Sequence, residues 1–428
     1  MIIKMIQKRS VFTFLFVALF AFSYAQQNRA VSLQECLDRA VMEHPLYAQY
    51  QLQGQLTNLK VENLKSDLLP QFSVNGKASW QDKVIELPIT LPGITIPTVS
   101  KDQYRLSVDV NQALYRGGLN KFQSEIEATN LALMDLATDK ELYSIKSQTK
   151  TLFFQIILID KQKQILQSYQ TILDQKLEES SVLVDEGVAL ESMRDVLKLE
   201  LLNTKQALFN LEANRSALIK NLNEFTQLNL DGNCDFTLPE ITSLPDAEQD
   251  RFEYRLMRIQ QKQLETSKRL LSAKTKPMLF AFATAGFGRP GFNVLSNDFD
   301  DFYMLGFNLS WKVWDWKKNK NELKMMDINK ALIETQKETF NMNIQLGLNQ
   351  LEAEIDNQLS LLNNDPEIIQ LHQNIVKTAE AQFKNGTLST TDYVVELQKL
   401  NQAKLNFELH RITLVNSKLA YIELLGKL

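Results

Sequence analysis

The chain has 428 residues, of which 44% are hydrophobic and 23% are charged. This is enough apolar material for a sizeable core, and the length alone allows two or three domains. The 47 Lys and Arg residues are balanced by 51 Asp and Glu residues, which gives a net charge of −4. Because there is no basic excess, nucleic acid is not an expected partner. The 14 glycines and 10 prolines are few for this length, which favours long helices over an all-β or a disordered chain.

The residue types that usually carry chemistry are sparse. Two cysteines, Cys36 and Cys234, are too few for a Cys-rich zinc site or a disulfide scaffold. They can pair in an oxidising compartment if the fold brings them together, or remain two free buried thiols. The three histidines lie far apart in the sequence, at His44, His372 and His410. No phosphate-binding, metal-ligand or nucleophile motif is present, so the sequence predicts a protein that is not an enzyme and has no cofactor.

Residues 1–25 have the composition of a secretory signal peptide. A basic start is followed by an apolar run from Val11 to Phe22 and then by Ala25, which predicts cleavage after Ala25. This run is too short to span about 30 Å of hydrocarbon as a helix, so a retained membrane anchor is the weaker interpretation. No later stretch is long and apolar enough for a transmembrane helix. Entry into a membrane would therefore require a β-barrel.

Helical patterns occupy most of the mature chain. Two very long runs, 118–184 and 317–384, contain almost no helix-breaking residues. Within the second run, Asp365-Pro366 predicts a kink or a restart of the helix. The other helices are expected over 31–69 with a turn at His44-Pro45, 190–228, 247–276 and 389–425. The segment 229–246 contains one glycine and two prolines and is expected to be a linker.

Four shorter segments have the pattern of strands. Three of them alternate apolar and polar residues, which is typical of a strand with one apolar and one polar face. The expected strands are about 71–80, 104–115, 278–288 and 303–314. The third is apolar on both faces and is assigned because it follows the order of the elements in the first half of the chain.

The two halves of the chain repeat each other at an offset of 199 residues. Tyr104 matches Tyr303 at this offset, and apolar positions further along correspond as well. A constant offset over a long distance is typical of an internal structural repeat. The sequence therefore predicts a first repeat over 26–228 and a second over 247–428. Each repeat reads helix, strand, strand, very long helix and helix.

The long helices need partners along their length. A helix of 67 residues is about 100 Å long, which is too long for a compact domain. Mostly apolar residues of the return helix recur at spacings of four and three, which is the pattern of a coiled-coil seam. These residues are Leu197, Leu201, Thr204, Leu208, Leu211, Arg215, Leu218, Leu222 and Phe225. The pattern predicts a wall of helices, although a helix buried in an ordinary bundle has similar stripes.

The apolar faces and the lengths of the strands suit a tilted crossing of a lipid bilayer. The candidate lipid-facing residues are Val74, Leu106, Val108, Leu305, Phe307 and Leu309. Aromatic residues near the strand ends resemble two membrane-interface girdles, with Trp80, Tyr104 and Tyr303 at one level and Trp311, Trp314 and Trp316 at the other. Four strands cannot close a barrel, so two or more copies of the chain are expected to complete one as a ring. The alternative is a soluble sheet that packs its apolar face on helices.

The ordered set of short motifs resembles the TolC-like outer membrane efflux proteins. The strand ends Ala113–Gly118 and Val313–Lys318 and the turns Val184–Val188 and Phe383–Thr387 carry a likeness that covers essentially the whole mature chain. The resemblance implies a homotrimer that shares a 12-stranded outer-membrane β-barrel, four strands per chain, joined to an α-helical periplasmic tunnel. It also implies contact with outer membrane lipid, a periplasmic adaptor (membrane fusion) protein and an inner-membrane pump of the resistance-nodulation-division or ABC type.

In this family the helix-to-helix turns are the periplasmic tips that meet the adaptor. The matching residues here are Gly187, Val188, Leu190, Gly386, Thr387 and Leu388. The family closes its tip with a ring of acidic residues, and the candidates for this aperture are Asp392, Asp195 and Glu396. An acidic constriction favours cations, whereas the alternative is a solvated helix tip.

The tip also departs from the family. Its Tyr and Arg positions hold Phe383 and Leu388, so the polar lock of the family is not matched. The first turn is expected to be two residues longer than the second, because Asp195 follows Gly187 by eight residues whereas Asp392 follows its glycine by six.

The resemblance implies a passive exit duct of a tripartite efflux or type I secretion system. Such a duct lies in the cell outer membrane, extends into the periplasm and moves small molecules or proteins to the exterior. The residues leave one main alternative, a secreted periplasmic coiled-coil scaffold or stalk protein with no channel. An exported enzyme is a third and weaker interpretation, because histidines are scarce and no convergent polar motif is present.

Overall fold

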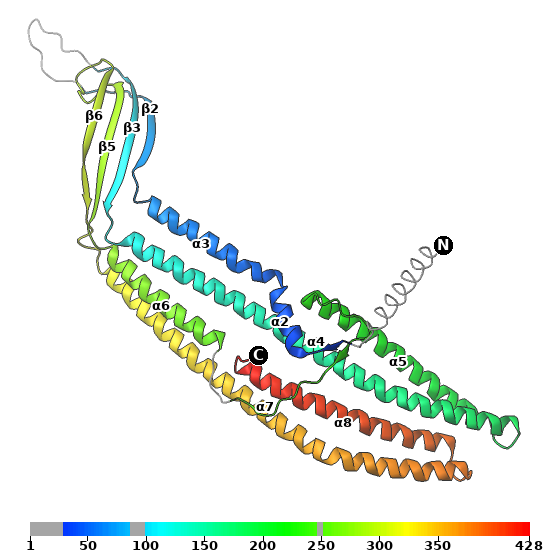
Figure 1. Cartoon of the computed structure of the whole chain (residues 1–428). Helices are drawn as coiled ribbons and strands as arrows, with labels where there is room; N and C mark the ends of the chain where they lie inside the picture. The colour runs from blue at the N-terminus through cyan, green and yellow to red at the C-terminus, as the bar shows by residue number, and fades with distance from the viewer. Residues whose placement is uncertain (1–28, 86–98, 246–250) are drawn as a thin grey trace, which may run out of the picture. The chain divides into compact units, whose positions relative to one another are not determined.

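The computed structural model describes residues 29–85, 99–245 and 251–428 (Figure 1). The expected signal peptide and its cleavage site lie outside these residues. The protein is mainly helical with a small β part, as the sequence predicts. It divides into two units, each built from separate stretches of chain. Unit 1 comprises the described parts of Met1–Tyr47, Asp139–Arg251 and Met342–Leu428, and unit 2 those of Ala48–Thr138 and Phe252–Asn341.

Two helices of 67 residues each, α4 and α7, are the longest elements. The helical elements are α2 (Leu33–Met42), η1 (Pro45–Ala48), α3 (Gln49–Ser66), α4 (Leu119–Asp185), α5 (Glu191–Thr226), α6 (Phe252–Ala273), α7 (Lys318–Lys384) and α8 (Thr390–Leu424). α7 continues through Pro366, so the expected restart does not occur. Next to the proline, α7 contacts α8, because Oδ2 of the buried Asp365 lies 2.8 Å from Nδ1 of His410. This contact supports α7 at the position where a kink would be expected.

In the described residues, six strands form two sheets. They are β1 (Ala30–Val31), β2 (Gln71–Trp80), β3 (Asp102–Tyr115), β4 (Asp235–Phe236), β5 (Met278–Arg289) and β6 (Asp300–Ser310). β6 ends four residues before the expected boundary at 314. Its partner β5 begins at Met278, directly after Pro277, so the residues beyond Ser310 have no strand to pair with. The tryptophans at 311, 314 and 316 therefore follow the strand instead of lying in it.

Unit 2 contains the larger sheet, which is antiparallel with the strand order β2-β3-β5-β6 (Figure 1). Each strand is joined to one helical segment by a short connection. α3 leads into β2, β3 leads into α4, α6 leads into β5, and β6 leads into α7. The helices are linked by ion pairs in that same order, through Lys60–Glu127 (3.1 Å), Arg269–Glu125 (2.9 Å) and Lys330–Glu265 (2.9 Å).

The two faces of this sheet have opposite character. The pairing register places Val74, Val108, Ala285 and Tyr303 in one row of the apolar face. One residue further along, the register places Ser73, Asp109, Thr284 and Met304 in a row of the opposite face. Within the described residues β2 and β6 pair on one side only, so the sheet has two free edges.

Unit 1 has a hydrophobic core that joins distant parts of the chain. Its buried members come from the N-terminal segment, α4, α5, the segment 228–234 and α8, and include Val31, Leu33, Cys36, Phe153, Ile156, Leu222, Cys234, Ile412 and Leu419. Cys36 and Cys234 are both in this core and are free, buried thiols. Burial raises the pKa of Cys36 to about 12, so this thiol is protonated at neutral pH.

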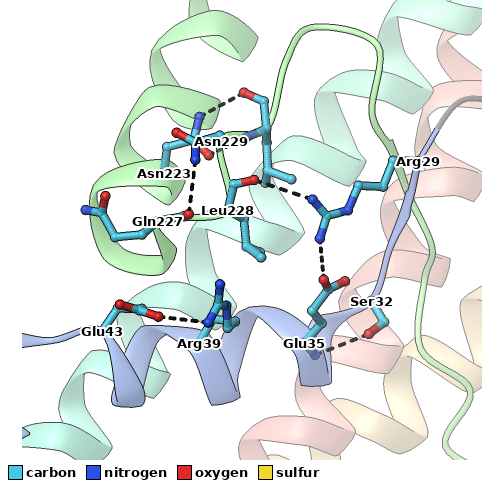
Figure 2. Close-up of polar contacts among 10 residues, drawn as sticks. Arg29, Ser32, Glu35, Arg39, Glu43, Asn223, Gln227, Leu228 and Asn229 are labelled. Atoms are coloured by element: carbon cyan, nitrogen blue, oxygen red, sulfur yellow. Dashed lines mark hydrogen bonds and ion pairs between the residues drawn. The ribbon is translucent and has the colours of Figure 1, made fainter. Parts of the chain in front are cut away.

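Polar contacts attach the start of the described chain to this core (Figure 2). Arg29 donates a hydrogen bond to the carbonyl oxygen of Leu228 (3.4 Å) and pairs with Glu35 (2.5 Å). The Ser32 hydroxyl accepts a hydrogen bond from the Glu35 N–H (3.2 Å) and caps α2. β1 pairs in parallel with β4 next to these contacts.

The predicted seam of α5 is confirmed. Its buried positions include Leu197, Leu201, Thr204, Arg215 and Leu222. The buried Arg215 is satisfied by Asp160 of α4 (2.5 Å) and by the carbonyl oxygens of Gly232 (2.7 Å) and Cys234 (2.9 Å). A buried arginine is tolerated only with such partners, and these fasten the segment after α5 onto the α4–α5 pair.

Candidate functional site

The two helix-to-helix turns of unit 1 share one backbone geometry. In the first, the N–H of Val188 donates to the Leu183 oxygen (2.9 Å) and that of Gly187 to the Val184 oxygen (3.0 Å). In the second, the N–H of Thr387 donates to the Gln382 oxygen (2.9 Å) and that of Gly386 to the Phe383 oxygen (3.0 Å). Both are Schellman motifs, and their glycines have φ values of 74° and 72°, a left-handed conformation that favours glycine.

The turns are equal in length, which corrects the expectation of a longer first turn. Five residues separate α4 from α5, and five separate α7 from α8. The expectation was wrong because it measured each turn from its glycine to the next aspartate, whereas a turn ends where the following helix begins. At the constant offset of 199, Asp195 corresponds to Val394, and Asp392 corresponds to Met193. The two aspartates therefore occupy different positions on their helices.

Asp392 is exposed in the first turn of α8 and forms a reciprocal cap with Ser389. The Ser389 hydroxyl accepts from the Asp392 N–H (3.1 Å) and donates to the Asp392 carboxylate (2.7 Å). The first turn lacks this cap, because Leu190 occupies the position before α5. Asp392 thus has a structural role at the helix end in addition to its negative charge.

The other aperture candidates are divided between the interior and the surface. Phe383 is buried and stacks on Tyr393, with ring centroids 4.9 Å apart and an angle of 9° between the planes. Leu388 packs against the buried hydrophobic cluster that contains both Phe383 and Tyr393. Asp195 is exposed, and Glu396 pairs with Lys399 on its own helix at 2.8 Å. The adaptor-contact candidates Val188 and Leu190 are 72% and 77% exposed, so the first turn presents apolar side chains to its surroundings.

A cluster near the turns joins the two helical hairpins, and the spacing of residues within one helix does not predict which helices meet there. Buried apolar residues of α4, α5, α7 and α8 meet there, among them Tyr169, Leu173, Leu197, Phe383, Tyr393 and Leu397. Burial raises the pKa of Tyr393 to about 12. The hydroxyl of Tyr169 donates to Glu200 (3.0 Å), which also accepts from Gln398 (2.9 Å).

Lys176 of α4 is buried beside this cluster and pairs with two carboxylates. Its ammonium lies 2.8 Å from Glu179 on its own helix and 2.8 Å from Glu380 on α7. Burial lowers the pKa of Lys176, but its hydrogen bonds to the two glutamates outweigh this and raise that pKa above its usual value. The hydrogen bond from Lys176 lowers the pKa of Glu380. These groups are 204 residues apart in sequence, so only the fold brings them together.

The apolar face of the larger sheet in unit 2 is exposed. Among the six candidate residues, exposure ranges from 46% for Val108 to 75% for Leu305. All six lie on one face in the pairing register: Val74, Leu106, Val108, Leu305, Phe307 and Leu309. In the described part of unit 2 no helix covers them, as the exposure of all six side chains shows.

The aromatic candidates are exposed as well, although their levels differ from the expectation. Exposure ranges from 44% for Tyr104 to 84% for Trp316. Tyr104 pairs with Ala78. Tyr303 lies in the row of Val74 and Val108, which is two rows away from Tyr104 on the same face. The offset of 199 fails here because the pairing register of each strand, not its place in the repeat, sets its height in the sheet. Trp80 lies at the end of β2, and the other three tryptophans lie beyond the end of β6.

The opposite face carries a satisfied polar network around Asp109, beside apolar residues of β5 and β6 such as Phe282 and Met304. The Asp109 carboxylate accepts from Thr284 (2.6 Å), Asn75 (2.7 Å) and Ser107 (3.0 Å). Nearer the loops, a cavity of about 570 Å³ is lined by several basic residues, including Lys77, Lys83, Arg105 and Arg289. The two faces therefore suit two different surroundings, one apolar and one aqueous.

Within the described ranges, no helix is both long and apolar enough to cross a membrane. In the same residues no group of three or more His, Cys, Asp or Glu side chains is placed to hold a metal ion.

Comparison with known proteins shows a likeness of fold. No protein-family model and no curated protein sequence matches the chain. The Campylobacter jejuni CmeC outer membrane channel is 14% identical, with a TM-score of 0.68 and coverage of 92% of this chain and 85% of that one. The outer membrane protein VceC of Vibrio cholerae is 11% identical, with a TM-score of 0.67 and coverage of 92% and 96%. The open state of the Neisseria gonorrhoeae MtrE outer membrane channel is 14% identical, with a TM-score of 0.66 and coverage of 92% and 88%.

These likenesses extend over the helices and the larger sheet together. The chain therefore has the fold of the TolC-like outer-membrane channels, as the sequence resemblance implied.

Proposed function

We propose that this protein is an outer-membrane channel-tunnel, the passive exit duct of a tripartite efflux or type I secretion system. Three copies form a homotrimer in which twelve strands close one barrel. The long helices continue as a tunnel through the periplasm. A signal peptide over 1–25 directs export, and the mature chain consists of two repeats, 26–228 and 247–428, joined by the linker 229–246.

The exposed apolar face of the four-stranded sheet carries this proposal. An exposed apolar face of this extent is unfavourable in water, and two free edges leave backbone groups unpaired. Lipid accommodates the apolar face, and neighbouring copies pair the edges. The fold likeness to three outer membrane proteins over 92% of the chain supports the same arrangement.

The partners proposed are a periplasmic adaptor protein and an inner-membrane pump of the resistance-nodulation-division or ABC type. The exposed turns at Gly187 and Gly386 are the proposed adaptor contacts, because Val188 and Leu190 present apolar side chains there. Asp392, Asp195 and Glu396 are proposed to give the aperture a negative charge that favours cations. Phe383 and Leu388 pack behind that aperture and support it from the interior.

The decisive experiment expresses the full chain in a Gram-negative bacterium and follows where it accumulates. We expect it in the outer-membrane fraction, released only by detergent, as cross-linkable trimers that conduct ions in planar bilayers. Recovery of a folded monomer in the soluble periplasmic fraction would instead support the coiled-coil scaffold and contradict the channel.

A further inference from the structure

The junction between the larger sheet and its helices carries a concentrated positive charge on one side. We define the Trp–Lys collar as residues 274–277, between α6 and β5, together with residues 311–320, between β6 and the first turn of α7. A hydrogen bond from Trp311 Nε1 to the Thr275 carbonyl oxygen (3.1 Å) holds the two segments together. The collar contains three exposed tryptophans and six exposed lysines, which are Lys274, Lys276, Lys312, Lys317, Lys318 and Lys320.

The lysines of the collar lack compensating charge. In the part of the chain that the structure describes, none of the six has a carboxylate within ion-pair distance. The collar contains one carboxylate, Asp315, which accepts a hydrogen bond from the Asn319 N–H (2.8 Å) and caps α7. Lys317, Lys318 and Lys320 also lie at the positive end of the α7 dipole, which opposes their charge further. A negatively charged group from outside the chain would compensate the lysine charges and offset their unfavourable interaction with the helix dipole.

The backbone of the collar is unusual at the same place. Trp316 and Lys317 have φ values of 55° and 68°, in the left-handed region that side chains other than glycine rarely adopt. At the offset of 199, the first repeat fills these positions with Gly117 and Gly118, which have φ values of 64° and 89°. The same turn is thus built without strain in one repeat and with strain in the other. Packing does not account for this, because Trp316 is 84% exposed.

The position of the collar next to the apolar face indicates the surroundings that it contacts. It follows directly on the exposed apolar face, whose last residue in β6 is Leu309. If that face lies in lipid, as the proposed function requires, the collar is at the level of the headgroups. Tryptophan prefers this level, and clustered lysines attract lipids with a negative headgroup. The corresponding junction of the first repeat has no such excess, since Arg116 pairs with Asp67 (3.6 Å).

We propose that the Trp–Lys collar is a binding surface for anionic phospholipid headgroups of the phosphatidylglycerol type, in the leaflet next to the helices. The lysine ammoniums bind the phosphate, and the indole rings occupy the boundary between headgroup and acyl chain. This inference rests on the proposed function. Three copies of the chain carry three such surfaces, one for each β5–β6 side.

The tryptophans provide a direct readout. The chain has four, and a Trp80→Phe background leaves only the three in the collar. This full-length protein is reconstituted in phosphatidylcholine vesicles that contain a small fraction of brominated phosphatidylglycerol or of brominated phosphatidylcholine. Bromine quenches tryptophan fluorescence on contact. We expect quenching by the anionic lipid to exceed that by the zwitterionic lipid by about fivefold, the enrichment that one lysine near an anionic surface provides.

Two further measurements test the role of the lysines. In the same background, a variant with Lys276, Lys312, Lys317 and Lys318 changed to Gln is expected to lose the excess. A matched control with four other exposed lysines changed to Gln, Lys198, Lys220, Lys337 and Lys377, is expected to keep it. Raising the salt concentration is expected to remove the excess from the unmodified collar without any substitution.

The outcomes separate this inference from the proposed function. Equal quenching by the two lipids, or an excess that survives both the collar substitutions and high salt, would overturn the lipid site while leaving the channel in place. An absence of quenching by either lipid would mean that the collar is not at a bilayer. That result would contradict the channel as well.

Discussion

At the scale of single residues, the tip of the second hairpin combines a helix cap with a charge. Asp392 bonds reciprocally with Ser389 and is also the leading candidate for the acidic aperture. A substitution of Asp392 by alanine removes both functions at once, so it cannot separate them. Asparagine keeps the shape and an oxygen that accepts the Ser389 hydrogen bond, while it removes the charge.

We therefore predict that Asp392→Asn lowers the cation preference of the open channel and leaves its thermal stability nearly unchanged. Ser389→Ala is the complementary variant, and it is expected to destabilise the protein by about 1 kcal/mol through loss of the cap. Ion selectivity in planar bilayers and the thermal midpoint in detergent are the two measurements. An unchanged selectivity of Asp392→Asn would remove Asp392 from the constriction.

A second residue-scale prediction concerns the turn glycines. Gly386→Ala places a Cβ on a backbone with φ of 72°, which costs about 1 kcal/mol, and a lower unfolding midpoint is expected. Gly187→Ala is expected to behave in the same way, because its φ is 74°. Gly232→Ala is the control, since nothing lies within 4 Å of an added Cβ there and its φ is not in the left-handed region. A similar loss in the control would show that the effect does not come from the turn conformation.

At the scale of elements, the ion cluster around Lys176 ties α4 to α7. The pKa of Glu380 is lowered below its ordinary value of 4.5, chiefly by the hydrogen bond from Lys176. A carboxylate with a lowered pKa stabilises the fold fully above the unfolded-state value. That stabilisation is lost as the pH falls through the folded-state value. The link between the hairpins is therefore acid-sensitive below about pH 4.5 and insensitive to small changes near neutrality.

We predict that the thermal midpoint of the unmodified protein falls more steeply on acidification below pH 4.5 than that of Glu380→Gln. The variant has no carboxylate to protonate at this position, so its curve is expected to be flatter and to start lower at pH 7. Glu367→Gln lies at an exposed position of the same helix and has no ion-pair partner among the described residues. It serves as the control and is expected to follow the unmodified protein. Parallel curves for Glu380→Gln and the unmodified protein would contradict the assignment.

At the scale of the whole molecule, assembly depends on which face of the sheet meets lipid. Val108 and Asn111 lie on the same strand and on opposite faces, and both are exposed. This pair offers a matched comparison of the two faces with one strand and one introduced charge.

We predict that Val108→Arg blocks assembly in the outer membrane, because an arginine facing the bilayer centre costs about 2–4 kcal/mol per copy. Asn111→Arg is expected to assemble normally, since its side chain faces the aqueous side. The yield of detergent-extracted trimers measures the effect. Normal trimers from Val108→Arg together with loss of trimers from Asn111→Arg would mean that the two faces are assigned the wrong way round.

Much of the architecture could be predicted from the sequence, because helix and strand periodicities are local. The 67-residue length of α4 follows from a run without glycine or proline, whereas α7 reaches the same length although it contains Pro366. The α5 seam follows from its spacings of four and three. β6 ends four residues before the boundary that the sequence predicts, because the alternation of apolar residues continues through Trp311 and Val313 after the partner strand has stopped. Whether a strand continues depends on the extent of the strand that pairs with it. That extent cannot be read from the strand's own residues.

The sequence by itself determined the two-fold repeat pattern, the amphipathic strands and the candidate turns, since each of these is written in the spacing of nearby residues. Only the tertiary structure decided that Lys176 meets Glu380, that Asp392 caps α8 with Ser389, and that the two turns have equal length. It also decided that Trp316 and Lys317 occupy the conformation that two glycines occupy in the first repeat. The physical reason is that ion pairs, caps and backbone strain depend on distances between groups in space, which a linear spacing of residues does not define.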